Sequence, residues 1–470
     1  MNNKNNIGVK GRWQEFKSIF TNKKVLTAIF VTIAILVLFR IGSILPMPYI
    51  HLNGESSQSG SGTFFDMMNL LGGGGLSRVS IFAIGISPYI TAQIIMQLLS
   101  TDLIPPLARM AKGGERGRKK IEIITRIVTL PIAAIQAYAI LTMVSSSGSE
   151  EGQQFVNFSE SMTFEQGSST FYFFFIALML SGTYISIFLG DLITKRGVGN
   201  GMTLIILAGI LSSFFNSFAS AFDAFKSISE TNKEVVQVIA FLVYVVFYIL
   251  LLLAVIFING SVRKIPIQQI GQTLSKNPDE LSYLPIKINA VGVIPVIFAS
   301  SIMTIPSTIA QFLDQSSSSA MVINQYFSLN SYTGIVLYFV LIILFTFFYS
   351  YVQLNPQKIS DDFKKSGRFI PGIKVGNDTE RHIAKIIFRI NWIGAPFLGI
   401  IATLPYLISS IWPIIPSNAA LGGTGIVIIV SATIEVWQSI KSTATTTNYQ
   451  YKRKEIEQGL FDSNSESKLW

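Results

Sequence analysis

Few residues of this chain are of the types that carry out chemistry. The sequence has no cysteine and only two histidines, His51 and His382, both in expected loops. It contains no phosphate-binding P-loop, no His-Glu-x-x-His pair and no Gly-x-Ser-x-Gly nucleophile turn. Thiol, metal and triad catalysis each need such residues at defined spacings. We therefore expect no cofactor and no enzymatic activity.

Acidic residues inside the apolar stretches are also scarce. Asp191 and Glu435 are the main candidates, and each lies near an expected cytoplasmic end. Ion-coupled transporters generally keep ionisable groups near the membrane midplane, where they are costly unless they function. The pattern therefore speaks against transport driven by protons or sodium. Of two arginines, we expect Arg40 to snorkel or pair with a loop and Arg78 to lie in an aqueous funnel.

The elements that must position these residues are membrane spans. Half of the 470 residues are hydrophobic and only 13% are charged, and this composition requires a lipid solvent. A bilayer core demands about 20 apolar residues per helix. Ten stretches meet that length, so the sequence predicts an all-α polytopic membrane protein with ten transmembrane helices, at 25–44, 79–99, 123–144, 170–189, 202–219, 235–258, 290–312, 333–353, 392–411 and 424–440.

Lysine and arginine alternate along the loops between these spans. They are dense in the amino-terminal segment, after each even-numbered span and in the tail, whereas 145–169, 313–332 and 412–423 contain none. Cytoplasmic loops retain such residues. We therefore predict a multi-pass protein of the cytoplasmic membrane with both termini in the cytoplasm. This asymmetry also accounts for the net charge of +10.

Ten spans divide into two halves of five with opposite orientation. The boundaries predict a cytoplasmic amino end at 1–24, a first half at 25–219, a second half at 235–440 and a cytoplasmic tail at 441–470. The second span of each half carries a Gly-x-x-Pro pattern, at 85–88 and 292–295, which predicts two bent central helices. Inverted halves usually place the functional site at their interface.

The second span is interrupted where it enters the membrane. A short amphipathic piece precedes four glycines, which we interpret as a hinge: Gly72, Gly73, Gly74 and Gly75. Non-helical backbone at membrane depth is tolerated only where it is buried in protein or lines a water-filled cavity. The break therefore predicts a cavity, and the amphipathic piece with its glycines is typical of a movable stopper beside a pore.

Isoleucines recur at helical spacing in the central spans. Ile86 and Ile90 lie four residues apart in the second span, and Ile206 and Ile210 do so in the fifth. Residues at i and i+4 share one helix face. Spacing alone does not separate a pore lining from ordinary helix packing or lipid contact.

Longer blocks of sequence resemble the SecY family, the pore subunits of bacterial Sec translocases. The similar blocks run from the first span into the tail: Gly85-Ile86-Ser87-Pro88-Tyr89-Ile90, the segment 190–201 (GDLITKRGVGNG), the segment 292–301 (GVIPVIFASS) and the segment 365–373 (KSGRFIPGI).

The resemblance implies an hourglass pore between the two halves that conducts unfolded preproteins and releases membrane segments laterally into the bilayer. It implies a ring of apolar side chains at the waist, formed by Ile86, Ile90, Ile206, Ile210, Ile297 and Ile428. It also implies that a short plug helix within 64–75 caps this ring, formed by Phe64, Phe65, Asp66, Met67, Met68, Asn69, Leu70 and Leu71. A narrow apolar constriction gates by dewetting. The lateral gate then lies between spans two and three and spans seven and eight, with Gln93, Gln136 and Ser300 along it.

The resemblance also implies partners. These are SecE-like and SecG-like small membrane subunits, the SecA ATPase, the ribosome and polypeptides that bear signal sequences. The docking residues it implies for SecA or the ribosome follow spans six and eight: Arg263, Lys264, Lys365, Arg368 and Lys374. Two pairs depart from the family pattern, because Asn259-Gly260 stands where Glu-Arg is common and Lys374-Val375 where Arg-Pro is common. Motor coupling is therefore the least secure part of this transfer.

Two other functions remain open. A ten-span solute permease is favoured by the inverted halves but opposed by the missing midplane charges and the large basic loops. A membrane enzyme ranks third, because the sequence contains no catalytic constellation.

Overall fold

The structure is a computed structural model that describes residues 23–52, 72, 74–76, 79–101, 104–146, 156–158, 168–227, 234–269, 282–310, 313, 317–329, 331–411 and 424–444. The expected plug at 64–71 lies outside the described residues, as do Gly73 and Arg78.

Ten helices among the described residues correspond to the ten expected spans. They are α2 (Lys23–Ile44), α4 (Ser87–Ser100), α6 (Gly114–Ser146), α7 (Ser169–Arg196), α8 (Gly201–Ser227), α9 (Glu234–Gly260), α10 (Ile294–Ala310), α12 (Tyr332–Leu354), α14 (Asn377–Ile411) and a final helix, Thr424–Ala444. Seven of the described helices are long and apolar enough to cross a membrane.

The helices α4 and α10 are short, at 14 and 17 residues, because each begins later than its hydropathy suggests. Gly85 and Gly292 adopt positive φ angles of 56° and 67° directly before them, a conformation that favours glycine. Pro88 and Pro295 then lie in the first helical turn, where a missing N–H costs nothing. The predicted bends were therefore wrong: the two Gly-x-x-Pro patterns start these helices instead of kinking them.

The helix α14 starts fifteen residues before the predicted span at 392. Its first turns bury Ile383, Ile386, Ile387 and Ile390, which follow the helical period and form one apolar face. His382 therefore lies on an exposed helical face and not in the predicted loop. The basic residues between the isoleucines masked this face from a search for continuous apolar stretches.

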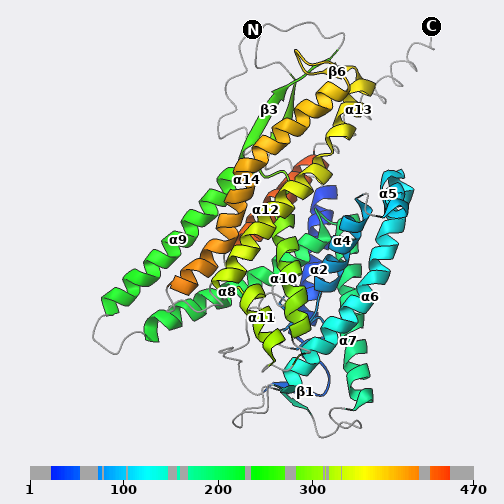
Figure 1. Cartoon of the computed structure of the whole chain (residues 1–470). Coiled ribbons are helices and arrows are strands. Elements are labelled where there is room, and N and C mark those ends of the chain that lie inside the picture. Colours follow the sequence, from blue (N-terminus) through cyan, green and yellow to red (C-terminus); the bar gives the residue numbers. More distant parts are fainter. Residues whose placement is uncertain are drawn as a thin grey trace, which may run out of the picture.

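The basic segments gather at one end of the molecule, where Figure 1 places α5 (Pro105–Lys112), α13 (Pro356–Ser366), β3 (Val262–Pro266) and β6 (Arg368–Phe369). There β3 pairs antiparallel with β5 (Tyr283–Lys287), and β4 (Gln268–Gln269) pairs with β6. The opposite end carries α11 (Ser318–Phe327) and β1 (Ile50–Leu52), which pairs with β2 (Val156–Phe158). This separation agrees with the alternation of lysine and arginine.

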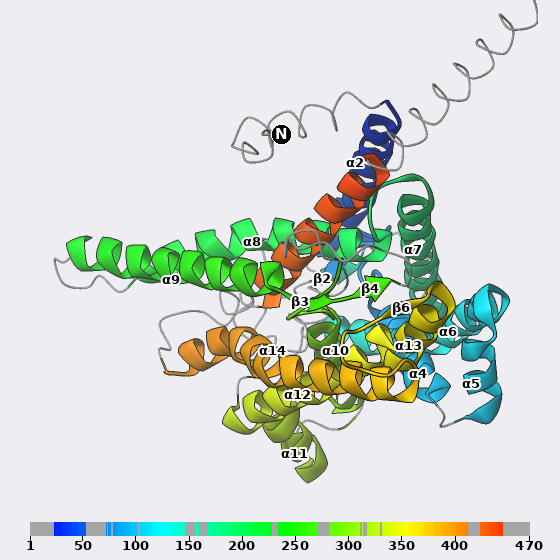
Figure 2. The same ribbon diagram turned by 90° about the horizontal axis from the view of Figure 1, so that it is seen from above.

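The helices form two groups that meet along one line. In the first group α4 packs on α6, α6 on α7, α7 on α8, and α2 on both α7 and α8; in the second, α12 packs on α10 and α14. The antiparallel pair α8 and α9 joins the groups, and α4 contacts α10 directly. Seen from above in Figure 2, α10 lies centrally, between α12 on one side and α8 with the final helix on the other.

Candidate functional site

The six isoleucines singled out in the sequence lie in one buried hydrophobic cluster. They come from four helices, α4, α8, α10 and the final helix, and each is at most 7% exposed: Ile86, Ile90, Ile206, Ile210, Ile297 and Ile428. The close packing is visible at Gly425, where an added Cβ would approach Ile210 Cγ2 to 3.0 Å. The structure thus brings together residues up to 342 positions apart, since 428 minus 86 is 342. Their role as a pore ring stays a prediction.

A cavity of about 350 Å³ lies against this cluster. Ile90, Ile206 and Ile297 line it, whereas Ile86, Ile210 and Ile428 lie beyond its lining. Ile90 follows Ile86 by one turn and Ile206 precedes Ile210 by one turn, so α4 and α8 run past the cavity in opposite directions. Three of the six isoleucines therefore lie at the cavity wall, and the other three lie in the same cluster outside the lining.

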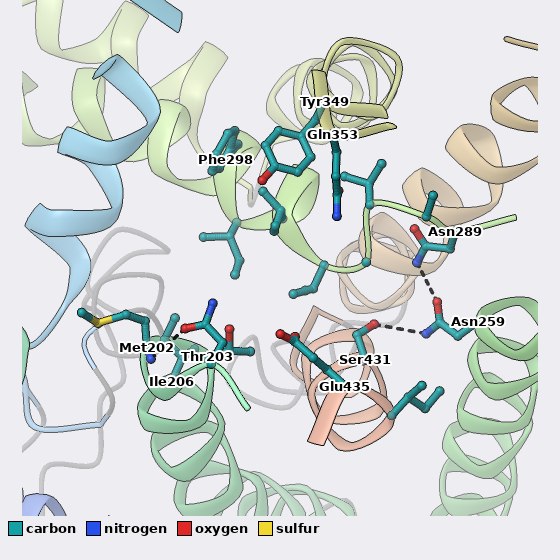
Figure 3. A pocket seen from close by; sticks show the side chains of 18 of the residues that line it. Met202, Thr203, Ile206, Asn259, Asn289, Phe298, Tyr349, Gln353, Ser431 and Glu435 are labelled. Carbon is teal, nitrogen blue, oxygen red and sulfur yellow. Dashed lines mark hydrogen bonds between the residues drawn. The ribbon is translucent and has the colours of Figure 1, made fainter. Parts of the chain in front are cut away.

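The rest of the cavity wall is mixed, with apolar residues such as Met202, Phe298 and Ile434 beside polar ones. Figure 3 shows Tyr349 and Gln353 projecting into it from α12, across from Ser431 and Glu435 on the final helix. Further polar residues line it: Gln93, Asn200, Thr203, Asn259, Lys287, Asn289 and Gln438. Polar side chains of the cavity therefore lie next to the isoleucine cluster.

Three amide and hydroxyl side chains form a hydrogen-bonded chain on one wall. Asn289 donates its side-chain N–H to Asn259 Oδ1 at 2.7 Å, and Asn259 donates to Ser431 Oγ at 3.1 Å (Figure 3). Asn259 is buried at 8% exposure, so these bonds satisfy its polar atoms. They tie the end of α9 and the segment before α10 to the final helix, three residues past Ile428.

The charged residues of the cavity balance one another. Lys287 donates to Gln438 Oε1 at 2.7 Å, and Glu435 lines the same cavity. Burial lowers the pKa of Lys287 from its ordinary value, and the nearby Glu435 carboxylate opposes this shift. The lining therefore holds one basic and one acidic residue.

The predicted glycine hinge lies directly against the backbone of two cavity helices. A Cβ added to Gly85 would come within 1.8 Å of the Gly72 carbonyl oxygen. A Cβ on Gly74 would lie 3.4 Å from Arg40 Nη1 and 3.5 Å from the Gly209 carbonyl oxygen. Gly85 precedes Ile86 and Gly209 precedes Ile210 in the sequence, so the hinge touches the chain immediately beside two of the six isoleucines.

Hydrogen bonds hold the last glycine of the hinge and the segment that follows it. Ser80 donates from its N–H at 3.2 Å and from Oγ at 3.0 Å to the Gly75 carbonyl, and Met47 donates to the Val79 carbonyl at 3.1 Å. Arg40 donates to Ser43 at 3.4 Å and to Ser212 of α8. Arg40 therefore contacts a neighbouring helix and the hinge, beyond the snorkelling or loop pairing predicted for it.

The predicted lateral-gate residues are placed separately. Gln93 is exposed in the cavity, Gln136 is buried in α6 at 5% exposure, and Ser300 donates to the Ile297 carbonyl of its own helix at 2.8 Å. Within the described part of the chain, no hydrogen bond joins these three residues. The predicted lateral gate, between spans two and three and spans seven and eight, coincides in part with the contact of α4 with α10. Their role as a gate stays a prediction.

The predicted docking residues lie on one small domain, because β4 pairs with β6 and thereby joins the loops after spans six and eight. The core of this domain includes Ile265, Ile286, Phe363 and Ile370. All five predicted residues are exposed on it: Arg263, Lys264, Lys365, Arg368 and Lys374. Of the two departures from the family pattern, Lys374-Val375 is exposed on this surface, whereas Asn259 faces the cavity.

One cluster of ion pairs was not predicted from the sequence. Arg126 of α6 contacts Glu122 at 2.5 Å and Asp191 of α7 at 2.6 Å, and Tyr184 donates to the Arg126 carbonyl at 2.8 Å. Asp191 was noticed as a solitary acid, but its partner lies 65 positions earlier. Among the described residues, no group of three or more His, Cys, Asp or Glu converges as a metal site would require.

The fold and the cavity define a class: a polytopic helical membrane protein with a partly polar cavity between two helical halves, beside a cluster of isoleucines. The family model described as SecY matches residues 80–437. The "Protein translocase subunit SecY" of Mycoplasmoides gallisepticum (strain R(low / passage 15 / clone 2)) is 49% identical over 458 residues, or 97% of this chain and 89% of that protein. The chain belongs to the SecY family.

Solved structures share the fold at low sequence identity. "The structure of a protein conducting channel" superposes with a TM-score of 0.60 at 17% identity, over 88% of this chain and 92% of that chain. "Sec61 in the Canine ribosome-channel complex from the endoplasmic reticulum" does so with a TM-score of 0.55, also at 17% identity and over the same shares of both chains.

Proposed function

We propose that this chain is a protein translocation channel, which passes unfolded preproteins across the cytoplasmic membrane and releases membrane segments sideways into lipid. The observation that supports this most directly is the set of six isoleucines from four helices, gathered in one buried cluster below a polar cavity. Membership of the SecY family supports the same function.

The proposed seal is the isoleucine ring. Isoleucine is β-branched and stiff at χ1, so six such side chains form a gasket that fits around an extended polypeptide without recognising its sequence. Water and ions find no hydrogen-bonding groups there. The plug at 64–71 and the hinge at 72–75 would close the outer side, and the halves at 25–219 and 235–440 would part at Gln93, Gln136 and Ser300.

We further propose that the basic end of the molecule faces the cytoplasm, with both termini on that side. Its exposed cations suit an acidic or RNA-containing partner, which fits docking of the ribosome or of SecA on the small domain. The Sec61 structure above contains a ribosome. Small subunits like SecE and SecG would complete the complex within the bilayer.

The ring is tested by replacing one isoleucine and measuring ion conductance. Ile428→Ser introduces a hydroxyl into the apolar layer, and Ile434→Ser, on the same helix but lining the polar cavity, is the matched control. We expect ion leakage through the closed channel for Ile428→Ser alone, with preprotein translocation retained in reconstituted vesicles. A permease would instead show changed uptake of a solute and no change in ion leakage.

Docking is tested separately by Arg368→Glu, which reverses one exposed charge on β6. We expect weaker, salt-dependent binding of ribosomes or of SecA in co-sedimentation, because exposed charges act within about 8 Å at physiological salt. Lys120→Glu is the control, as Lys120 is exposed near the start of α6, outside this domain. Equal losses for both variants would refute a docking site on the small domain.

A further inference from the structure

The polar mouth of the cavity is unusually rich in side-chain amides. Of the 22 residues that line the cavity, six are carboxamides: Gln93, Asn200, Asn259, Asn289, Gln353 and Gln438. A carboxamide offers N–H donors and a carbonyl acceptor, the same pair of groups that a peptide unit presents. The side-chain amides of the wall therefore offer hydrogen-bond donors and acceptors to the peptide unit, which every polypeptide repeats.

The mouth is also electrically balanced. Lys287 and Glu435 are the charged residues of the lining, so their formal charges cancel in a chain whose net charge is +10. A mouth with an excess of either sign would retain segments of the opposite charge. Neutral amides avoid this selectivity.

Four of the six amides are held in place by the protein itself. Asn259 and Asn289 belong to the series of hydrogen bonds that ends on Ser431. Asn200 accepts a hydrogen bond from the Met202 N–H at 3.1 Å, and Gln438 accepts one from Lys287. These bonds fix the wall and leave little rotamer freedom to lose on binding.

The other two amides are exposed in the cavity and come from opposite halves of the molecule. Gln93 extends from α4 in the first half, and Gln353 extends from α12 in the second, where Figure 3 shows it pointing into the cavity. Within the described residues, neither side chain makes a hydrogen bond to another residue. A strand of polypeptide between them would reach both halves at once.

We propose that Gln93 and Gln353 form a binding site for the main chain of an extended polypeptide, backed by the fixed amides of the opposite wall. This inference rests on the proposed function and adds how the passing chain is held. Each main-chain hydrogen bond changes the residence of the chain by about two- to tenfold. Two such bonds retain a segment against slipping back and still release it.

The test follows the backward slippage of a trapped polypeptide in vesicles that contain the full chain with its partner subunits and motor. Three preproteins with one signal sequence and neutral, acidic or basic mature parts are halted by a folded domain. The energy source is then removed, and loss of the protease-protected fragment is timed. The variants are the double replacement Gln93→Leu with Gln353→Leu, the single replacement Gln353→Glu, and the control Gln357→Leu, which is exposed on α13 and outside the cavity lining.

We expect the double variant to shorten the half-life of all three fragments by one common factor of about 4- to 100-fold, and Gln357→Leu to leave it unchanged. Gln353→Glu should shorten the half-life of the acidic fragment and lengthen that of the basic one. Unchanged half-lives in the double variant, or effects that differ among its three fragments, would overturn the inference. If the unmodified chain protects no fragment, the proposed function itself fails.

Discussion

Replacement of Gly85 by alanine tests whether the hinge and the isoleucine cluster depend on one another. Gly85 has a φ of 56°, and the Cβ of an alanine would lie 1.8 Å from the Gly72 carbonyl oxygen. Contacts under 3.0 Å are essentially never observed for a Cβ atom. The hinge must therefore retreat from Gly85 by at least about 1.2 Å, the difference between these two distances.

The variant carries two separate costs. The left-handed backbone costs an alanine roughly 1–2 kcal/mol, and overpacking against a fixed neighbour costs about 1–3 kcal/mol more. Only the overpacking cost depends on the hinge lying against Gly85. If it falls on the closed state alone, the ratio of open to closed channels rises by about 5- to 150-fold.

Gly292→Ala separates these costs because the second half supplies a matched position. Gly292 has a φ of 67° and no atom within 4 Å of an added Cβ, so its variant carries the backbone cost without the clash. Single-channel recording in planar bilayers measures the open probability of both variants, and thermal unfolding measures their stability. Equal open probabilities for Gly85→Ala and Gly292→Ala, at equal stability, would refute the coupling of hinge and cluster.

Two further predictions concern polar contacts between helices. Asn259→Leu leaves Asn289 and Ser431 without their shared partner; both line the cavity, so each lost hydrogen bond costs about 0.5–1.5 kcal/mol, and we expect a lower midpoint of thermal unfolding in detergent. Asp191→Asn removes one of the two carboxylates that pair with Arg126, whose side chain is 37% exposed, and we expect a loss of at most about 1 kcal/mol of stability, measured by thermal unfolding. A midpoint unchanged in either variant would show that the contact contributes nothing to the folded state.

The sequence predicted the membrane helices well because hydropathy and basic residues are local signals. The spans from 235 and from 333 agree with α9 and α12 to within two residues. The signal failed where polar residues alternate with a buried face, as in the first turns of α14, and where glycine and proline delay a helix, as at Gly85 and Gly292. A continuous apolar window cannot register either feature.

The residues of the candidate site were likewise predicted only in part. Six isoleucines were identified from spacing and resemblance, and the structure places all six in one cluster. A cavity was predicted from the break in the second span, but the polar part of its wall, with Gln353, Asn289 and Lys287, was not. Single polar residues at the ends of helices carry no periodic signal, so no sequence pattern groups them.

By itself, the sequence determined that the chain needs a membrane and which stretches cross it, because composition and hydropathy act residue by residue. Only the tertiary structure decided which isoleucines meet, that Asn259 turns inward to Asn289 and Ser431, and that Asp191 finds Arg126. These contacts join segments up to hundreds of residues apart, and only the packing of helix against helix fixes which side chains become neighbours.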